Sequence, residues 1–173
     1  TILECAMLEA GSEGKSFDTI VASGWRSAYP HGTATDKVIE EGDLVTFDFG
    51  AIYHGYHSDI TRTVAVGEIS ERQRYIYDAV LGCNEHIEKI LRAGLAAADV
   101  DQESRKYLKE KDLDKWFGHA LGHSVGLEIH ETPTLSPRDH TVLCAGMTET
   151  VEPGVYILGV GGVRIEDTVV IEK

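Results

Sequence analysis

Thr46-Phe-Asp-Phe-Gly-Ala-Ile-Tyr-His-Gly-Tyr-His-Ser-Asp-Ile-Thr-Arg-Thr63 is the stretch that decides the fold. Two runs rich in β-branched and aromatic residues flank a Tyr-His-Gly-Tyr turn, and this pattern predicts a β-hairpin. Each run carries one acid, Asp48 or Asp59, and the reversal brings the two acids opposite or nearly opposite each other. Their charges repel unless both acids face solvent, one is protonated, or a cation lies between them. The hairpin alone leaves these three explanations open.

Helices and further strands are predicted on both sides of the hairpin. Residues 2–10 have the pattern of a helix end, and residues 17–23 that of a strand. A Ser70-x-x-Gln capping box precedes a long amphipathic helix that Gly94 closes, and a weaker helix is expected from about residue 99 to 111. The chain therefore belongs to the α+β class, and its 173 residues suit one domain.

From Phe117 onward the chain is rich in glycine and histidine. His119 and His123 have the i, i+4 spacing that pairs two metal ligands on a helix, but the interspersed glycines make a helix doubtful. His130 follows, and His31 lies in an earlier loop dense in turn-forming residues. Taken alone, each of these histidines is more often a hydrogen-bonded or surface residue than a ligand.

Two more acids lie in β-strand contexts near the end of the chain. Glu152 begins a Glu-Pro-Gly turn between two short strands, and Glu166 lies in a final strand expected over residues 163–171. Arg164 and Glu166 share one face of that strand, which fits either a buried ion pair or a functional role.

Composition excludes some classes of partner. The formal net charge of −13 opposes binding to nucleic acids and to anionic membranes, and there is no long apolar run. The three cysteines have no CxxC or metal-finger spacing, which favours a reducing, cytoplasmic location. Because the chain begins with Thr1 in what looks like the end of a helix, we expect that it is truncated at the N-terminus.

The acids and one histidine together form a ligand set for metals: Asp48, Asp59, His123, Glu152 and Glu166. Carboxylates with one imidazole suit Mn(II), Co(II), Zn(II) or Fe(II), and four carboxylates neutralise two divalent ions. Two such ions about 3.5 to 4 Å apart form the usual clamp of metal-dependent hydrolysis.

Five short motifs follow one another along the chain: Pro30-His-Gly; Asp48-Phe-Gly with Ser58-Asp-Ile-Thr-Arg-Thr63; Gly118-His-x-x-Gly-His-x-x-Gly-Leu-Glu-x-His-Glu131; Thr150-Val-Glu-Pro-Gly154; and Gly162-Val-Arg-Ile-Glu-Asp167. In order and spacing they resemble the motifs of the pita-bread metallopeptidases, and more narrowly the Xaa-Pro dipeptidase (prolidase) and aminopeptidase P branch. The resemblance covers residues 1–173 almost end to end as a catalytic domain. It implies a curved antiparallel β-sheet flanked by helices, with two pseudo-twofold halves.

The resemblance also implies a dinuclear site and a role for each matching residue. Asp48 is expected to bind one ion, Asp59 and Glu166 to bridge both, and His123 and Glu152 to complete the second. Glu152 is also expected to act as general base and acid. His130 would steady the oxyanion, His31 and His119 would line the substrate pocket, and Arg164 would orient the carboxylates.

The implied activity is metal-dependent hydrolysis of an Xaa-Pro bond in a short peptide, with manganese favoured and a homodimer expected for the full-length protein. The family usually carries an N-terminal domain, which we expect to be absent from residues 1–173, so dipeptidase and aminopeptidase P both stay open. Family members also often have apolar residues where this chain has Thr148 and Glu149. We expect Glu149 to face away from Glu152 and to be exposed at a sheet edge.

Three other interpretations compete with this one. A methionine aminopeptidase would share the five ligand types, but the Arg-Ile-Glu-Asp tetrad and the Ser-Ala-Tyr-Pro-His loop favour the proline branch. A creatine amidinohydrolase-like enzyme uses the same fold without metal and would not be expected to keep all five ligands. A non-enzymatic binding module of this fold would usually have lost ligands, and this chain retains every one.

Overall fold

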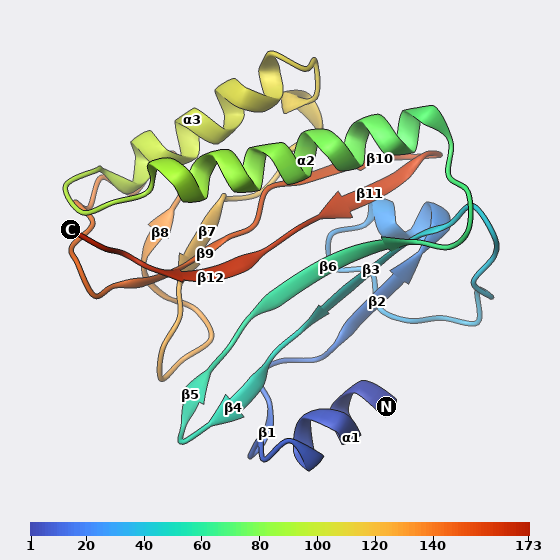
Figure 1. Ribbon diagram of the computed structural model, residues 1–173, viewed down its shortest axis with the longest axis horizontal. Coiled ribbons are helices and arrows are strands. Elements are labelled where there is room, and N and C mark those ends of the chain that lie inside the picture. Colours follow the sequence, from blue (N-terminus) through green and yellow to red (C-terminus); the bar gives the residue numbers. More distant parts are fainter.

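Two long helices cover one face of a set of antiparallel strands in the computed structural model, which describes residues 1–173 (Figure 1). The helices are α1 (Ile2–Glu9), α2 (Glu71–Ile90) and α3 (Ala97–Lys109), with short 3₁₀ helices at Gly24–Ala28 and Asp114–Trp116. The strands are β1 (Gly14–Lys15), β2 (Ile20–Ser23), β3 (Leu44–Phe49), β4 (Ala51–Tyr53), β5 (Tyr56–His57), β6 (Ile60–Ala65), β7 (Gly122–Ser124), β8 (Glu131–Leu135), β9 (Thr148–Val151), β10 (Gly154–Ile157), β11 (Gly161–Arg164) and β12 (Asp167–Val170). The expected α+β class with antiparallel strands is confirmed.

The predicted hairpin forms from β3 to β6 and is longer than one simple ladder. β3 pairs with β6, and β4 and β5 continue to a tight turn in which His54 and Gly55 have φ values of 50° and 76°. A two-residue turn with positive φ at both residues fits the right-handed twist of the flanking strands. Glycine adopts positive φ without strain, which explains its presence at position 55. Asp48 lies directly opposite Thr61, so Asp59 is its diagonal neighbour two residues along the strand.

The second half of the chain builds a related arrangement, in which Glu152 and Glu166 lie at strand junctions. β9 pairs with β12, and β10 pairs with β11. Glu152 lies between the end of β9 and the start of β10, and Glu166 lies between the end of β11 and the start of β12. The prediction of one continuous strand over residues 163–171 is therefore wrong, because the chain changes pairing partner at residues 165–166. An antiparallel bridge between Thr61 and Glu166 joins the two halves.

The core lies between the helices and the strands of the second half. The predicted capping box of α2 is present, with the Ser70 hydroxyl accepting from Gln73 N–H. Ile76, Val80 and Ile87 on α2 are fully buried in one apolar cluster with residues of α3, β9, β10 and β11. α3 begins two residues earlier than expected, at Ala97. None of the helices combines the length and the apolar character that a membrane crossing requires.

Glu149 is completely buried, so the prediction that it is exposed at a sheet edge is wrong. Its strand, β9, lies inside the order β12-β9-β7-β8 and has a neighbour on both sides. The Ser124 hydroxyl donates to Glu149 Oε1 at 2.6 Å, and burial raises the pKa of this carboxyl to about 7. Because side chains alternate along β9, the Glu149 side chain does point to the opposite face of the sheet from Thr150.

Gly122 makes the close approach of β7 and β9 possible. A Cβ atom at this position would overlap the backbone carbonyl of Thr150, which cannot move without breaking the sheet. We predict that Gly122→Ala lowers the free energy of unfolding by about 1 to 3 kcal/mol or more, as overpacking of a core does. Thermal unfolding followed by circular dichroism measures the effect.

Gly118→Ala is the matched control, because a Cβ there has no atom within 4 Å. It should leave the melting temperature almost unchanged. Equal melting temperatures for the two variants would contradict the packing argument.

Candidate metal centre

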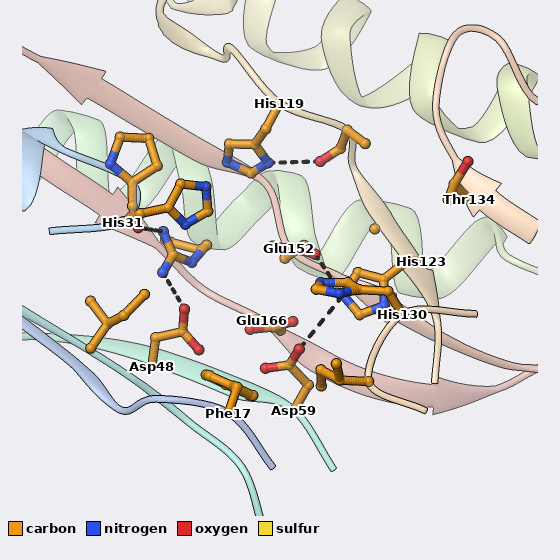
Figure 2. Close-up of a pocket in the computed structure, with 16 residues that line it drawn as sticks. Phe17, His31, Asp48, Asp59, His119, His123, His130, Thr134, Glu152 and Glu166 are labelled. Atoms are coloured by element: carbon orange, nitrogen blue, oxygen red, sulfur yellow. Dashed lines mark hydrogen bonds and ion pairs between the residues drawn. The ribbon is translucent and has the colours of Figure 1, made fainter. Parts of the chain in front are cut away.

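A pocket of about 490 Å³ opens between the β3–β6 hairpin and the strands of the second half (Figure 2). It collects every residue for which the sequence predicted a functional role: His31, Asp48, Asp59, His119, His123, His130, Glu152, Arg164 and Glu166. Phe17, Ile20 and Ile129 add apolar surface to its wall. Side chains as far apart in the sequence as Phe17 and Glu166 thus share one cavity.

One strand and three strand ends or junctions direct the four acids into this pocket. Asp48 lies in β3, and Asp59 immediately precedes β6. Glu152 and Glu166 occupy the two junctions described above, where the chain leaves one pairing partner for the next. His123 comes from β7, in which Ser124 takes the opposite face, consistent with strand rather than helix geometry for this segment.

Three of the predicted ligands are already arranged around one point. Ligand atoms of Asp59, His123 and Glu166 all lie within 4.8 Å of one another. His123 Nε2 is 3.6 Å from Asp59 Oδ2 and 3.5 Å from Glu152 Oε1, so Glu152 adjoins the same group. Figure 2 shows these four side chains gathered together, with Asp48 set apart toward His31.

The carboxylates contain buried oxygens that find no partner within the protein. Asp48 Oδ1, Asp59 Oδ1 and Glu166 Oε1 are shielded from solvent and accept no hydrogen bond. A buried carboxylate oxygen without a partner is costly, and a cation is the natural partner for several that converge. The donor set therefore fits divalent metal, with hard oxygen ligands and one imidazole nitrogen.

The pKa values of these acids show the cost of gathering them. Burial raises the pKa of Glu152 to about 7. Burial, reinforced by the charges of Glu152 and Asp59, raises that of Glu166 well above its ordinary value. Burial also raises the pKa of Asp48, although Arg164 acts against it. Without a cation, burial thus makes Asp48, Glu152 and Glu166 harder to ionise.

His123 is oriented as a metal ligand would be. Its Nδ1 lies 3.0 Å from the carbonyl oxygen of Ser124, and because a carbonyl only accepts, Nδ1 carries a proton. Nε2 then faces Asp59 and Glu152 and is the free nitrogen of the neutral ring. Burial lowers the pKa of His123, but Asp59, Ser124 and Glu152 outweigh this and raise it. When the ring is protonated, the second proton is on Nε2, between Asp59 and Glu152, where a metal ion would otherwise lie.

A chain of hydrogen bonds connects Asp48 to His119. Arg164 donates to Asp48 Oδ2 at 2.5 Å and to the Tyr156 hydroxyl at 2.8 Å. That hydroxyl lies 2.9 Å from His119 Nε2, and His119 Nδ1 lies 2.7 Å from the Ala120 carbonyl, so Nδ1 donates and Nε2 accepts. Burial lowers the pKa of His119 to about 4, so this ring is neutral at physiological pH. Arg164 thus pairs with Asp48 rather than with its strand neighbour Glu166.

Tyr156 and Thr61 are site residues that the sequence reasoning missed. Thr61, fully buried, donates to Glu166 Oε2 at 2.6 Å and accepts from Arg164 Nε at 3.1 Å. Tyr156 links Arg164 to His119, and burial raises its pKa to about 12. No local sequence pattern singles out Tyr156, and only the fold shows that its ring fills the space that Gly154 and Gly162 leave.

His31 and His130 are exposed residues of the pocket wall. The carbonyl of Pro30, next to His31, accepts from Arg164 Nη1 at 3.1 Å, which ties this loop to the site. The His130 ring stands edge-on to that of His123, with 4.5 Å between their centroids. Partial desolvation of the ring and the neighbouring His123 lower the pKa of His130, which favours a neutral ring with one N–H to donate.

Comparisons of the sequence with family models and with known proteins point to the same family of peptidases. The family model described as "Metallopeptidase family M24" matches residues 1–173. The chain is 52% identical over 171 residues to a protein of Pyrococcus furiosus named Xaa-Pro dipeptidase, a match that covers 99% of this chain and 49% of that protein.

Solved structures are similar over the same region. The prolidase from Pyrococcus furiosus superimposes with a TM-score of 0.97 at 51% identity, covering 99% of this chain and 51% of that one. The X-Pro aminopeptidase from Thermotoga maritima gives a TM-score of 0.96 at 46% identity, covering 99% and 49%. The chain spans about half the length of the relatives it matches.

The raised pKa of Glu152 predicts a stability that falls with pH in the metal-free protein. Between its ordinary value of 4.5 and about 7, the folded state binds more protons at Glu152 than the unfolded state does. The contribution of Glu152 to the free energy of unfolding is therefore fully present below pH 4.5 and is lost as the pH rises through 7. The free energy of unfolding falls by up to about 1.4 kcal/mol per pH unit over this range. Urea unfolding of metal-free protein from about pH 5 to 8 measures the slope.

Glu152→Gln is the matched variant, because glutamine has a similar shape and does not ionise. Its stability should fall less steeply over the same range. Identical slopes for the variant and the unchanged protein would show that Glu152 does not titrate as described.

Asp59→Ala should abolish metal uptake with little effect on the fold. Its side chain lies within the ligand group and contributes no hydrogen bond through Oδ1, so its removal takes away a donor and a repelling charge. We predict that Mn(II) affinity, measured by titration calorimetry, falls at least about 100-fold while far-UV circular dichroism is unchanged. Asp18→Ala, at a side chain that is 91% exposed, is the control. Retention of full Mn(II) binding by Asp59→Ala would refute the assignment.

Proposed function

Because the chain belongs to metallopeptidase family M24, we propose that it hydrolyses the peptide bond that precedes proline, as an Xaa-Pro dipeptidase. The observation that carries this proposal is the convergence of four carboxylates and His123 in one pocket. Relatives named Xaa-Pro dipeptidase, about half identical to this chain, support the choice of substrate. Residues 1–173 form the catalytic domain in this proposal.

Family membership and the donor set imply divalent metal, and we propose two ions, with manganese favoured over cobalt, zinc or iron. Asp48 would hold one ion, His123 and Glu152 the other, and Asp59 and Glu166 would bridge them. When bound, such ions lower the pKa of a water molecule and polarise the carbonyl group under attack. The buried oxygens without partners on Asp48, Asp59 and Glu166 support this assignment.

Glu152 is suited to move the proton of the attacking water. Its carboxyl group lines the pocket beside His123, where it can accept a proton from the water and return it to the leaving nitrogen. The Thr150 hydroxyl donates to Glu152 Oε1 at 3.2 Å, and the Glu152 backbone N–H donates to the Leu121 carbonyl, so both the side chain and the backbone are held in place.

The histidines supply hydrogen-bond donors and a wall for the substrate. His130, beside His123 and accessible from solvent, can donate to the carbonyl oxygen as negative charge develops on it. His31 and His119 line the pocket on the side of Arg164. Arg164, through its bond to Asp48, would orient that carboxylate rather than contact the substrate.

The pocket also suits the special geometry of an Xaa-Pro bond. Proline has no backbone N–H, so a peptidase cannot bind this bond as one strand of a fully hydrogen-bonded ladder. Recognition then depends on a surface shaped to the pyrrolidine ring. The apolar side chains of Phe17, Ile20 and Ile129 provide such a surface beside the polar centre.

Aminopeptidase P activity is the second candidate, and the similarity to the Thermotoga maritima X-Pro aminopeptidase favours it. The two activities differ in substrate length, since one cleaves a dipeptide and the other removes the first residue of a longer chain. A homodimeric full-length protein and a cytoplasmic location stay predictions of the sequence, to be checked by sedimentation and by fractionation.

One substrate panel tests the proposal. We predict that the full-length protein, loaded with Mn(II) or Co(II), hydrolyses Gly-Pro and that a chelator stops the reaction. Cleavage of Xaa-Pro-Xaa tripeptides without cleavage of Gly-Pro would indicate aminopeptidase P, and cleavage of Met-Ala-Xaa alone would indicate methionine aminopeptidase. The absence of metal-dependent hydrolysis of any of these peptides would contradict an enzymatic function.

A further inference from the structure

α3 carries an ion pair that takes no part in the ligand set. Asp101 is completely buried, and its Oδ2 and Oδ1 accept from Nε and Nη2 of Arg105 at 2.7 and 3.0 Å. α3 packs against α2 on the side of the molecule away from the β3–β6 hairpin (Figure 1). The pair would thus be expected to stabilise the helix layer alone.

Its remaining hydrogen bonds go instead to the segment Phe117–Leu121, which leads into the pocket. Arg105 donates to the carbonyl of Phe117 at 3.1 Å and to that of His119 at 2.7 Å. Asp101 Oδ1 accepts from the backbone N–H of Leu121 at 3.1 Å. One ion pair, of which the carboxylate is fully buried and the arginine partly exposed, therefore holds three backbone groups within five consecutive residues.

Ring contacts extend this hold to the His119 side chain. The Arg105 guanidinium lies 4.6 Å from the centroid of the Phe117 ring, and that ring meets the His119 ring edge-on at 5.1 Å. With its carbonyl and the ring beside it both fixed, His119 presents Nε2 to the Tyr156 hydroxyl. A small rotation of this segment would break that bond and move the imidazole in the pocket.

We propose that Asp101 and Arg105 are positioning residues, which fix the segment Phe117–Leu121 so that His119 keeps its direction in the substrate pocket. The proposal rests on the proposed function in so far as His119 contacts substrate. Arginine is required because its planar fork donates to a carboxylate and to two carbonyls at once, whereas a lysine ammonium cannot span them.

Arg105→Lys is the first test variant, since it keeps a positive charge beside Asp101 and removes the fork. The double variant Asp101→Asn with Arg105→Met is the second, because it leaves no unpaired buried charge. In the full-length, metal-loaded protein each should lower kcat/KM for Gly-Pro about 10- to 100-fold, the scale expected for a displaced positioning group. Each change is repeated in a His119→Ala background, where it should have almost no further effect.

Two controls separate positioning from loss of stability. Ile87→Ala removes a fully buried side chain from α2, which does not contact Phe117–Leu121 through any hydrogen bond, and it should lower the melting temperature with little change in kcat/KM. Lys109→Met changes an exposed charge at the end of α3 and should leave both quantities unchanged.

Nitrogen NMR of the His119 ring gives a readout that does not depend on activity. In the unchanged protein the ring should remain a single Nδ1–H tautomer that does not titrate near pH 6.5, because burial lowers its pKa to about 4. In the Arg105 variants it should titrate closer to that ordinary value. The His119→Ala spectrum assigns the signal.

Unchanged kcat/KM and an unchanged His119 signal in the Arg105 variants would overturn the proposal. So would an equal loss of kcat/KM with and without His119, since this would indicate a general structural effect. If the unchanged protein hydrolysed no Xaa-Pro peptide, the proposed function would fail, and the NMR result would still decide whether the pair positions His119.

Discussion

Repulsion among four carboxylates, three buried and one half-buried, is the constraint on which the rest of this structure depends. Asp48, Asp59, Glu152 and Glu166 approach the same cavity from two halves of the chain, and burial raises the pKa of three of them. A fold keeps such an arrangement only if protons or cations neutralise it. The partnerless oxygens indicate that cations serve this purpose, and the hydrolytic chemistry of family M24 follows from the same arrangement.

The hydrogen bonds around the cavity show how the fold holds these acids, and only Asp48 has a cationic side chain, Arg164, as its partner. Thr61 and Arg164 each occupy one oxygen of a carboxylate and leave the other oxygen free. Tyr156 extends the network to His119, and α3 anchors the segment that carries His119. The helix layer thus does more than cover the sheet, because it is connected by hydrogen bonds to the wall of the substrate pocket.

Much of the site was predictable from the sequence, because acids within β-rich runs stand out against their apolar neighbours. All nine proposed site residues line one pocket, although their individual roles stay predictions. The break at residues 165–166, the burial of Glu149 and the role of Tyr156 were not predictable. Each depends on which strands become neighbours, or on a partner such as His119 that lies 37 positions away, and local patterns do not contain that information.

The central claim is that the carboxylate cluster exists to hold two divalent ions, and the metal content of the protein tests it most directly. Full-length protein would be stripped with a chelator, equilibrated with Mn(II), dialysed and analysed by mass spectrometry of the metal. The account predicts two ions per chain, and it predicts that their binding releases protons from the ligands. A content of zero or one ion per chain would contradict it.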